Sequence, residues 1–139
     1  MPTSEQASGP PSPVVGAKVL VAADDTLVAL DLMTTLQTAG YVVVGPVSAV
    51  AEALTIIDSE PPDAAVLDLR FAAGDTAPVA AALLAGDVPF GVLTDDEDGL
   101  ELEPVLASAP RLAKPVQPEA LLSLVHDLLQ GRRNPAPPR

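Results

Sequence analysis

Residues 64–68 read Ala-Ala-Val-Leu-Asp, and this short run decides the fold. Four consecutive apolar residues predict a buried strand of the kind found in parallel sheets that helices cover on both faces. Asp68 comes directly after them, where the strand ends. Pro61 and Pro62 end the helical pattern before the run, and Gly74 lies in the loop after it.

Short apolar runs and helical patterns alternate on both sides of this strand, as in βαβ units. The predicted strands cover 18–22, 41–45, 64–67, 88–93 and 111–113. Helices are predicted over about 26–39, from a Ser48 cap to Pro61, near 77–85, weakly after Glu103, and from Pro118 onward. The pattern indicates an α/β domain with a doubly wound, five-stranded parallel sheet. We expect the flavodoxin-like strand order 2-1-3-4-5, with helices on both faces.

Composition is consistent with one small domain between two tails. The chain has 139 residues, of which 48% are hydrophobic and only 2% aromatic, so Leu, Val, Ala and Ile must build the core. Residues 1–16 and 131–139 are rich in proline and small polar residues and are predicted to be disordered tails. The folded domain is therefore expected over 17–130.

The charge balance narrows the choice of partners. The formal net charge is −12, from 19 acidic against 7 basic residues, which argues against nucleic acid and favours a basic protein surface or a cation among carboxylates. Without cysteine, the chain forms neither disulfides nor thiolate metal sites. It shows no leader pattern and no run near the roughly 18 apolar residues that span a bilayer. We therefore expect a cytoplasmic protein that does not bind membranes.

Four polar residues stand where predicted strands end: Asp24, Asp68, Thr94 and Lys114. That edge is where open α/β sheets bind ligands. In the expected order the first and third strands are neighbours, about 4.8 Å apart, so Asp24 and Asp68 could hold one cation together. A site with one or two carboxylates suits Mg²⁺ with phosphate oxygens. Lys114 starts two strands away from Asp68, but its long side chain can turn back over the edge.

At these residues the chain resembles the receiver domain of two-component response regulators over 17–130. The matching segments are Val-Leu-Val-Ala-Ala-Asp24-Asp25, Ala-Ala-Val-Leu-Asp68-Leu, Val-Leu-Thr94 and Leu-Ala-Lys114-Pro115. The resemblance implies that Asp68 accepts a phosphoryl group from a histidine kinase or phosphotransfer protein, and that Thr94 and Lys114 contact the phosphate. It also implies a Mg²⁺ held by Asp24, Asp68 and the backbone carbonyl of Arg70.

The sequence departs from the receiver pattern at two positions. Receivers usually carry two adjacent acids after the first strand, and here the first of them is replaced by Ala23, which weakens the expected metal site unless Asp25 contributes. Arg111 stands where receivers place an aromatic switch residue. Residues 92–96 also show weak similarity to a receiver subgroup with a Phe-Ala-Thr-Gly-aromatic segment, although they read Val-Leu-Thr-Asp-Asp.

Several of these residues also have simpler explanations. Asp25 fits better as a cap of the first helix than as a metal ligand. The acidic run from Asp95 to Glu103 lacks the spacing of a calcium loop and is expected to be a solvated surface. His126 is the single histidine, so multi-histidine metal sites are excluded, and so is Ser-His catalysis unless His126 serves alone.

Three functions remain in competition. The leading hypothesis is a stand-alone response regulator that is not an enzyme, is phosphorylated on Asp68 and signals by contact with a downstream protein. The second is a degenerate receiver that binds proteins without phosphorylation, as Ala23 and Arg111 suggest. The third, an aspartyl-phosphate phosphatase of the haloacid-dehalogenase type, is disfavoured because Arg70 stands where that family needs an acid. The sequence leaves a homodimer open.

Overall fold

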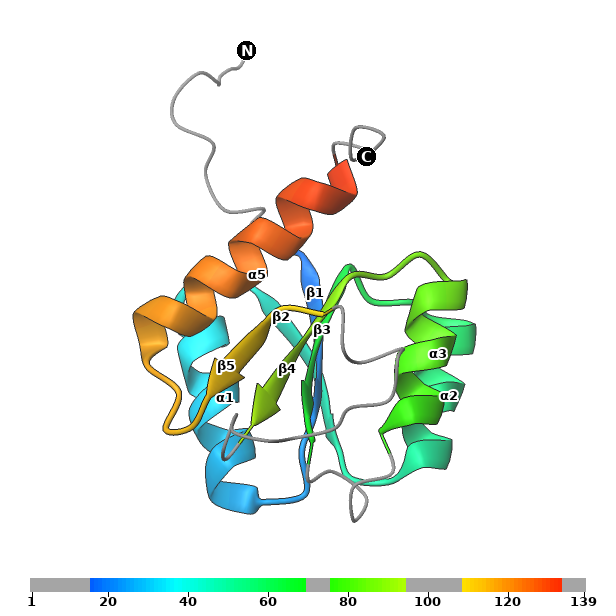
Figure 1. Cartoon of the computed structure of the whole chain (residues 1–139), viewed down its shortest axis with the longest axis horizontal. Helices are drawn as coiled ribbons and strands as arrows, with labels where there is room; N and C mark the ends of the chain where they lie inside the picture. Colours follow the sequence, from blue (N-terminus) through cyan, green and yellow to red (C-terminus); the bar gives the residue numbers. More distant parts are fainter. Residues whose placement is uncertain (1–15, 70–75, 95–108, 134–139) are drawn as a thin grey trace.

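One parallel sheet organises the protein (Figure 1). The computed structural model describes residues 16–69, 76–94 and 109–133, with only the backbone of 131–133. Its strands are β1 (Lys18–Ala22), β2 (Val42–Val47), β3 (Ala64–Asp68), β4 (Phe90–Thr94) and β5 (Arg111–Ala113), in the order β2-β1-β3-β4-β5. The predicted parallel sheet and its order are confirmed.

Helices cover both faces of this sheet, as predicted. Figure 1 shows α1 (Thr26–Thr38) and α5 (Pro118–Arg133) on one face, and α2 (Val50–Ser59) and α3 (Ala77–Ala85) on the other. Alternate residues of each strand face opposite sides, so one sheet supports two apolar layers. In β1, Val19 and Val21 pack toward α1 and α5, whereas Leu20 and Ala22 pack toward α2 and α3.

Asp68 lies at the centre of this arrangement because β3 is the middle strand. Every residue of β3 is buried, and its neighbours β1 and β4 are buried over most of their lengths. Ala22 of β1 pairs with Leu67, and Asp68 pairs with Leu93 of β4. The ends of β1, β3 and β4 therefore lie at one edge of the sheet. Polar residues that follow these strands therefore meet at that edge.

Helix α5 packs closely on β4 because residue 91 is glycine. A Cβ atom placed on Gly91 would lie 2.7 Å from Cδ2 of Leu124, inside van der Waals contact. Leu124 belongs to the layer that α5 buries with Val125 and Leu128. The missing side chain at position 91 therefore sets how near α5 lies to the sheet.

Two predicted details of local structure are wrong. Ser48 was expected to cap α2, but Ala49 is the capping residue and no side chain caps this helix. The physical reason is that α2 begins at Val50, so Ser48 lies one residue too early; Glu52 in the first turn interacts favourably with the helix dipole instead. β2 also continues beyond residue 45 to Val47, where its pairing with β1 shifts register.

The last helix is longer than the predicted domain. α5 continues to Arg133, three residues into the segment assigned to the C-terminal tail. Residues 1–15 and 134–139, the acidic run Asp95 to Glu103 and the predicted weak helix after it lie outside the described residues.

Candidate functional site

A buried ion pair joins Asp68 at the end of β3 to Lys114, which follows β5. The Lys114 Nζ donates to Oδ2 of Asp68 at 2.8 Å. The side chain of Asp68 is only 2% exposed and that of Lys114 15%. A carboxylate buried this deeply needs a charged or hydrogen-bonding partner. The structure thus brings together two predicted residues that start two strands apart along the edge.

Thr94 ends β4 at the same edge and brings a buried hydroxyl. Thr94 pairs with Ala113 of β5, and the backbone carbonyl of Thr94 accepts a hydrogen bond from the backbone N–H of Lys114 at 2.7 Å. The Oγ1 atom of Thr94 is fully buried and has no hydrogen-bond partner within the described part of the chain. Such a group costs free energy unless a partner arrives, so it is suited to contact an oxygen of a bound ligand.

The turn between β1 and α1 contributes fewer carboxylates than its sequence suggests. Ala23 is 3% exposed, packs in the layer under α1 and α5, and donates its backbone N–H to the Val47 carbonyl at 3.1 Å. Asp24 is exposed to solvent. Oδ1 of Asp25 accepts from the backbone N–H groups of Leu27 and Val28, at 2.9 and 3.2 Å.

These contacts support the capping role considered for Asp25. Its carboxylate is the N-cap of α1, as its side-chain hydrogen bonds to the first turn require. Asp24 and Asp68 remain the predicted carboxylate ligands of a cation. Arg70, whose carbonyl was expected as a further ligand, lies outside the described residues. Within the described ranges, no three carboxylate or imidazole groups cluster closely enough to hold a metal.

The residues present still fit Mg²⁺ when a phosphate group completes its coordination. Mg²⁺ commonly binds one or two protein carboxylates, keeps several waters and takes the remaining oxygens from phosphate. Asp24 and Asp68 supply that number, and the buried Thr94 hydroxyl, which has no partner among the described residues, and the Lys114 ammonium supply donors for an anion. These side chains therefore bring possible cation ligands and anion donors to one edge of the sheet.

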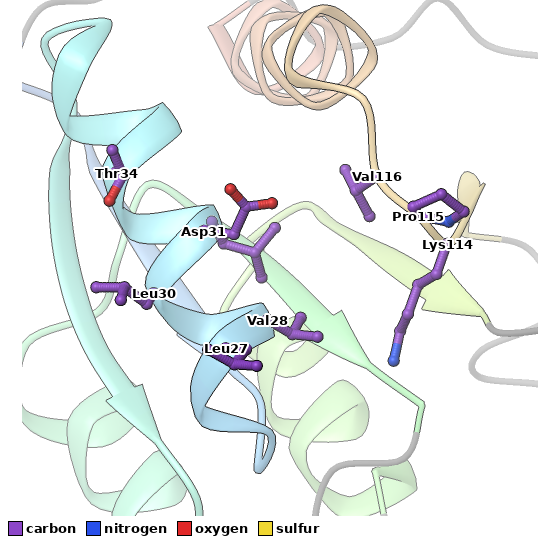
Figure 2. Close-up of a pocket in the computed structure, with 9 residues that line it drawn as sticks. Leu27, Val28, Leu30, Asp31, Thr34, Lys114, Pro115 and Val116 are labelled. Atoms are coloured by element: carbon purple, nitrogen blue, oxygen red, sulfur yellow. The ribbon is translucent and has the colours of Figure 1, made fainter.

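Beside the ion pair lies a groove of about 800 Å³ that the sequence reasoning missed. Figure 2 shows α1 on one side of it and Lys114, Pro115 and Val116 on the other. Leu27 and Leu30 of α1 are 76% and 54% exposed, which is unusual for large apolar side chains. Their spacing of three residues on the outer face of a helix was the available signal. Lys114 belongs both to this groove and to the ion pair with Asp68.

Arg111, at the position where the resemblance implies an aromatic switch residue, lies within the described part of the structure. Arg111 is exposed on β5, at the outer edge of the sheet. An exposed guanidinium cannot move between a buried and an exposed position as an aromatic ring can. Any change that spreads from Thr94 must therefore use other residues.

Neither the known family models nor the curated proteins contain a match to this sequence. Its fold does match solved structures. The BeF3-activated conformation of SdrG from Pseudomonas melonis is 31% identical with a TM-score of 0.69, over 84% of this chain and 98% of that one. The signal receiver domain of a modulated diguanylate cyclase from Desulfovibrio desulfuricans is 27% identical with a TM-score of 0.75, over 85% and 97%.

A third likeness shows the fold alone. The anti-anti-sigma factor PhyR from Bartonella quintana is 21% identical with a TM-score of 0.71, over 86% of this chain. The chain spans about half the length of PhyR, since it covers 51% of that protein.

The strand order, the residues at the strand ends and these structural likenesses all indicate the same family. The chain belongs to the receiver domains of two-component response regulators. In its described part, no helix has the length and apolar character needed to cross a membrane.

Proposed function

We propose that this protein is a response regulator receiver that accepts a phosphoryl group on Asp68 from a phosphohistidine of a histidine kinase or phosphotransfer protein. The observation that carries this proposal is the buried Asp68 carboxylate held at 2.8 Å by Lys114. At the same edge, the buried Thr94 hydroxyl has no hydrogen-bond partner among the described residues. A structural ion pair alone would explain the first contact. It would not explain why the buried Thr94 hydroxyl lacks a hydrogen-bond partner among the described residues.

The proposed reaction is a transfer between two nucleophiles. A carboxylate oxygen of Asp68 forms a bond to phosphorus while the phosphorus–nitrogen bond of the donor breaks and its electron pair stays on the imidazole, which takes up a proton from solvent. When bound, Mg²⁺ would neutralise part of the phosphoryl charge. Lys114 would then hold a phosphoryl oxygen through its ammonium, and Thr94 would donate its hydroxyl.

Signalling would follow from the new charge. Phosphorylation adds about −1.5 to −2 charges at a site where Lys114 is already close. Lys114 and Thr94 would draw toward the added oxygens, moving the ends of β4 and β5 relative to α1. A downstream protein would recognise that changed surface, so the chain acts as a phosphoacceptor and not as an enzyme with a substrate of its own.

Intact mass measurement tests the phosphoacceptor role. Incubation with acetyl phosphate and Mg²⁺ should add one phosphoryl group, and hydroxylamine should remove it as it removes acyl phosphates. Asp68→Asn should abolish the gain, whereas Asp58→Asn, at an exposed position on α2, should leave it unchanged. A phosphoryl group that survives hydroxylamine, or persists in Asp68→Asn, would contradict the proposal.

A second candidate is a degenerate receiver that binds partners without phosphorylation. The buried Ala23 methyl group favours it, because the usual metal-binding acid is missing there. The same mass experiment separates the two candidates. An unmodified protein at saturating Mg²⁺, with its ion pair intact, would establish the degenerate alternative.

The groove beside Asp68 is the surface we assign to the phosphoryl donor. Lys114 lines this groove and contacts Asp68, so a protein that docks there places its phosphohistidine near the acceptor. The exposed Leu27 and Leu30 suit the apolar face of a partner helix. Partners of this kind fit the strongly acidic chain best when their contact surface is basic.

Matched leucine variants test this docking surface. Leu30→Ser should slow phosphotransfer from a purified, phosphorylated histidine phosphotransfer protein, but should leave phosphorylation by acetyl phosphate unchanged. Leu84→Ser is the control, because Leu84 is similarly exposed, at 55% against 54%, but lies on α3 across the sheet. Equal slowing by both variants would show that the groove has no special role.

A further inference from the structure

β2 is an edge strand whose outer side carries open backbone hydrogen-bonding groups. Within the described part of the chain the sheet order is β2-β1-β3-β4-β5, so β2 pairs with β1 alone. The backbone N–H of Val42 donates to the Ala17 carbonyl at 2.9 Å. Because the N–H and C=O of one trans peptide unit point in opposite directions, the Tyr41 carbonyl points away from β1. By the alternation of a strand, the N–H and the carbonyl of Val43 point outward as well.

The first half of β2 lacks the features with which proteins protect sheet edges. Charged side chains, proline or a bulge usually guard an edge strand against pairing. Pro46 and the register shift beside it protect the end of β2. Residues 42–44, in contrast, are three consecutive valines, which favour pairing between strands. Val42 is 47% exposed, so an apolar side chain lies open beside the unpaired backbone.

The charge distribution indicates which partner suits this edge. Each chain carries a formal net charge of −12, so two copies repel each other wherever their acidic surfaces meet. The longest stretch without a charged side chain is 32–51, and it contains all of β2. Two copies can therefore approach at this edge with the least repulsion. The N-terminal segment of the same chain suits the edge poorly, because Pro10, Pro11 and Pro13 lack the N–H group that strand pairing needs.

A second copy matches the edge because antiparallel pairing of β2 with itself is symmetric about Val43. Val43 of each copy would donate to and accept from Val43 of the other, as in the hydrogen-bonded pairs of antiparallel sheets. Val42 of one copy would then lie opposite Val44 of the other, and its exposed side chain would be covered. The outward Tyr41 carbonyl would lie beside Gly45 of the other copy, where the pairing ends.

We propose that two copies of this protein associate through β2, in antiparallel orientation, to form one continuous sheet across a twofold axis. Such a contact uses the same surface of both copies, as twofold interfaces do. The paired segment is short, so the association should be weak and should depend on protein concentration. The two Asp68 edges would point in opposite directions and stay open, so the inference is independent of phosphorylation.

Two measurements on the unchanged chain test the association. In sedimentation equilibrium, the average mass should rise from that of one chain toward that of two between about 10 μM and about 1 mM protein. In amide exchange followed by NMR, the Val43 N–H should exchange about tenfold or more slowly at the high concentration, because pairing protects it. The Val44 N–H is the internal control. It is bonded to β1 with or without a second copy, so its exchange should not change.

Matched charge variants locate the surface. Val42→Glu should weaken the association about tenfold or more, because its carboxylate would be buried against Val44 of the other copy. Leu84→Glu is the control, because it adds the same charge at a similarly exposed position, 55% against 47%, on α3. It should change the association less than about twofold, as a surface change elsewhere would.

A disulfide tests the pairing register, since the chain has no cysteine of its own. The Val42→Cys/Val44→Cys double variant should form linked dimers with oxidised glutathione, because residues directly opposite each other in such a pair have a Cα separation that a disulfide spans. Val42→Cys alone should not form them. In the proposed register its two copies are diagonal neighbours, about 7–8 Å apart.

Each contrary result would overturn the inference and leave the phosphoacceptor role intact. A chain that stays monomeric up to about 1 mM has no such contact. A dimer that Val42→Glu and Leu84→Glu weaken equally is held by another surface or limited by net charge alone. Val43 exchange that does not depend on concentration would exclude pairing at β2, and it decides the matter even if Val42→Glu fails to fold.

Discussion

Replacing Thr94 by valine should stabilise the protein while damaging its proposed site. The hydroxyl of Thr94 is fully buried and has no hydrogen-bond partner within the described residues. An unsatisfied buried hydroxyl costs about 1–3 kcal/mol in proteins. Valine has nearly the same shape and removes that cost, so the free energy of unfolding should rise by about 1 kcal/mol or more.

Thr76 provides a matched control for this substitution. It is the other described residue with a buried hydroxyl that lacks a partner, and it precedes α3 instead of ending β4. Thr76→Val should give a similar stability gain. In thermal unfolding, each kcal/mol corresponds to about 4 °C for a domain of this size. The two variants should therefore both unfold at a temperature several degrees above that of the unchanged chain.

Binding of beryllofluoride, an analogue of the phosphoryl group, should distinguish the roles of the two hydroxyls. Loss of a hydrogen bond to a charged group costs about 1.5–3 kcal/mol, so Thr94→Val should bind beryllofluoride about tenfold to a hundredfold more weakly. Thr76→Val should bind it normally. The reasoning fails if Thr94→Val lowers stability, because its hydroxyl then has a partner. It fails equally if both variants bind beryllofluoride alike, because Thr94 then does not contact the anion.

Three further changes test the rest of the structure. Gly91→Ala should lower the free energy of unfolding by about 1–3 kcal/mol in urea denaturation, because its Cβ would meet Leu124, and adding Leu124→Ala should make the Gly91→Ala change less costly. Asp25→Ala should cost about 1 kcal/mol through loss of the α1 cap, whereas Asp25→Ser should cost less than half of that. Burial raises the pKa of Tyr41 above 10.0, so ultraviolet titration of this single tyrosine should show phenolate forming at higher pH than in the unfolded chain. Stability should accordingly fall as the pH rises above 10.0 toward the folded pKa; a midpoint at 10.0 would contradict this.

The sheet could be predicted because its strands carry an unambiguous pattern. Short apolar runs such as 64–67 and 18–22 are too brief for helices, and the helical periodicity between them leaves few alternative topologies. The strand ends then follow by geometry, which placed Asp68 and Thr94 at one edge. Each of these inferences depended only on neighbours in sequence and on the regular spacing of strands.

The sequence was insufficient where a residue's role depends on where a helix begins or on how two distant segments pack. Ser48 and Ala49 differ by one residue, and sequence alone favours the hydroxyl, yet α2 begins after the alanine. The sequence left open whether Asp25 caps α1, and only its distances to the α1 backbone show that it does. The groove required α1 and the residues after β5 to be placed side by side, which no local pattern describes.

Lys114 links the features that were found separately. It pairs with Asp68, its backbone N–H is bonded to Thr94, and its side chain forms part of the groove beside α1. A phosphoryl group on Asp68 would take over the Lys114 ammonium, and a protein docked in the groove would cover the same side chain. Both events act on one residue, so each must change the free energy of the other. A donor that binds the resting ion pair would therefore bind the phosphorylated protein with a different affinity, and a lower affinity after transfer would favour its release.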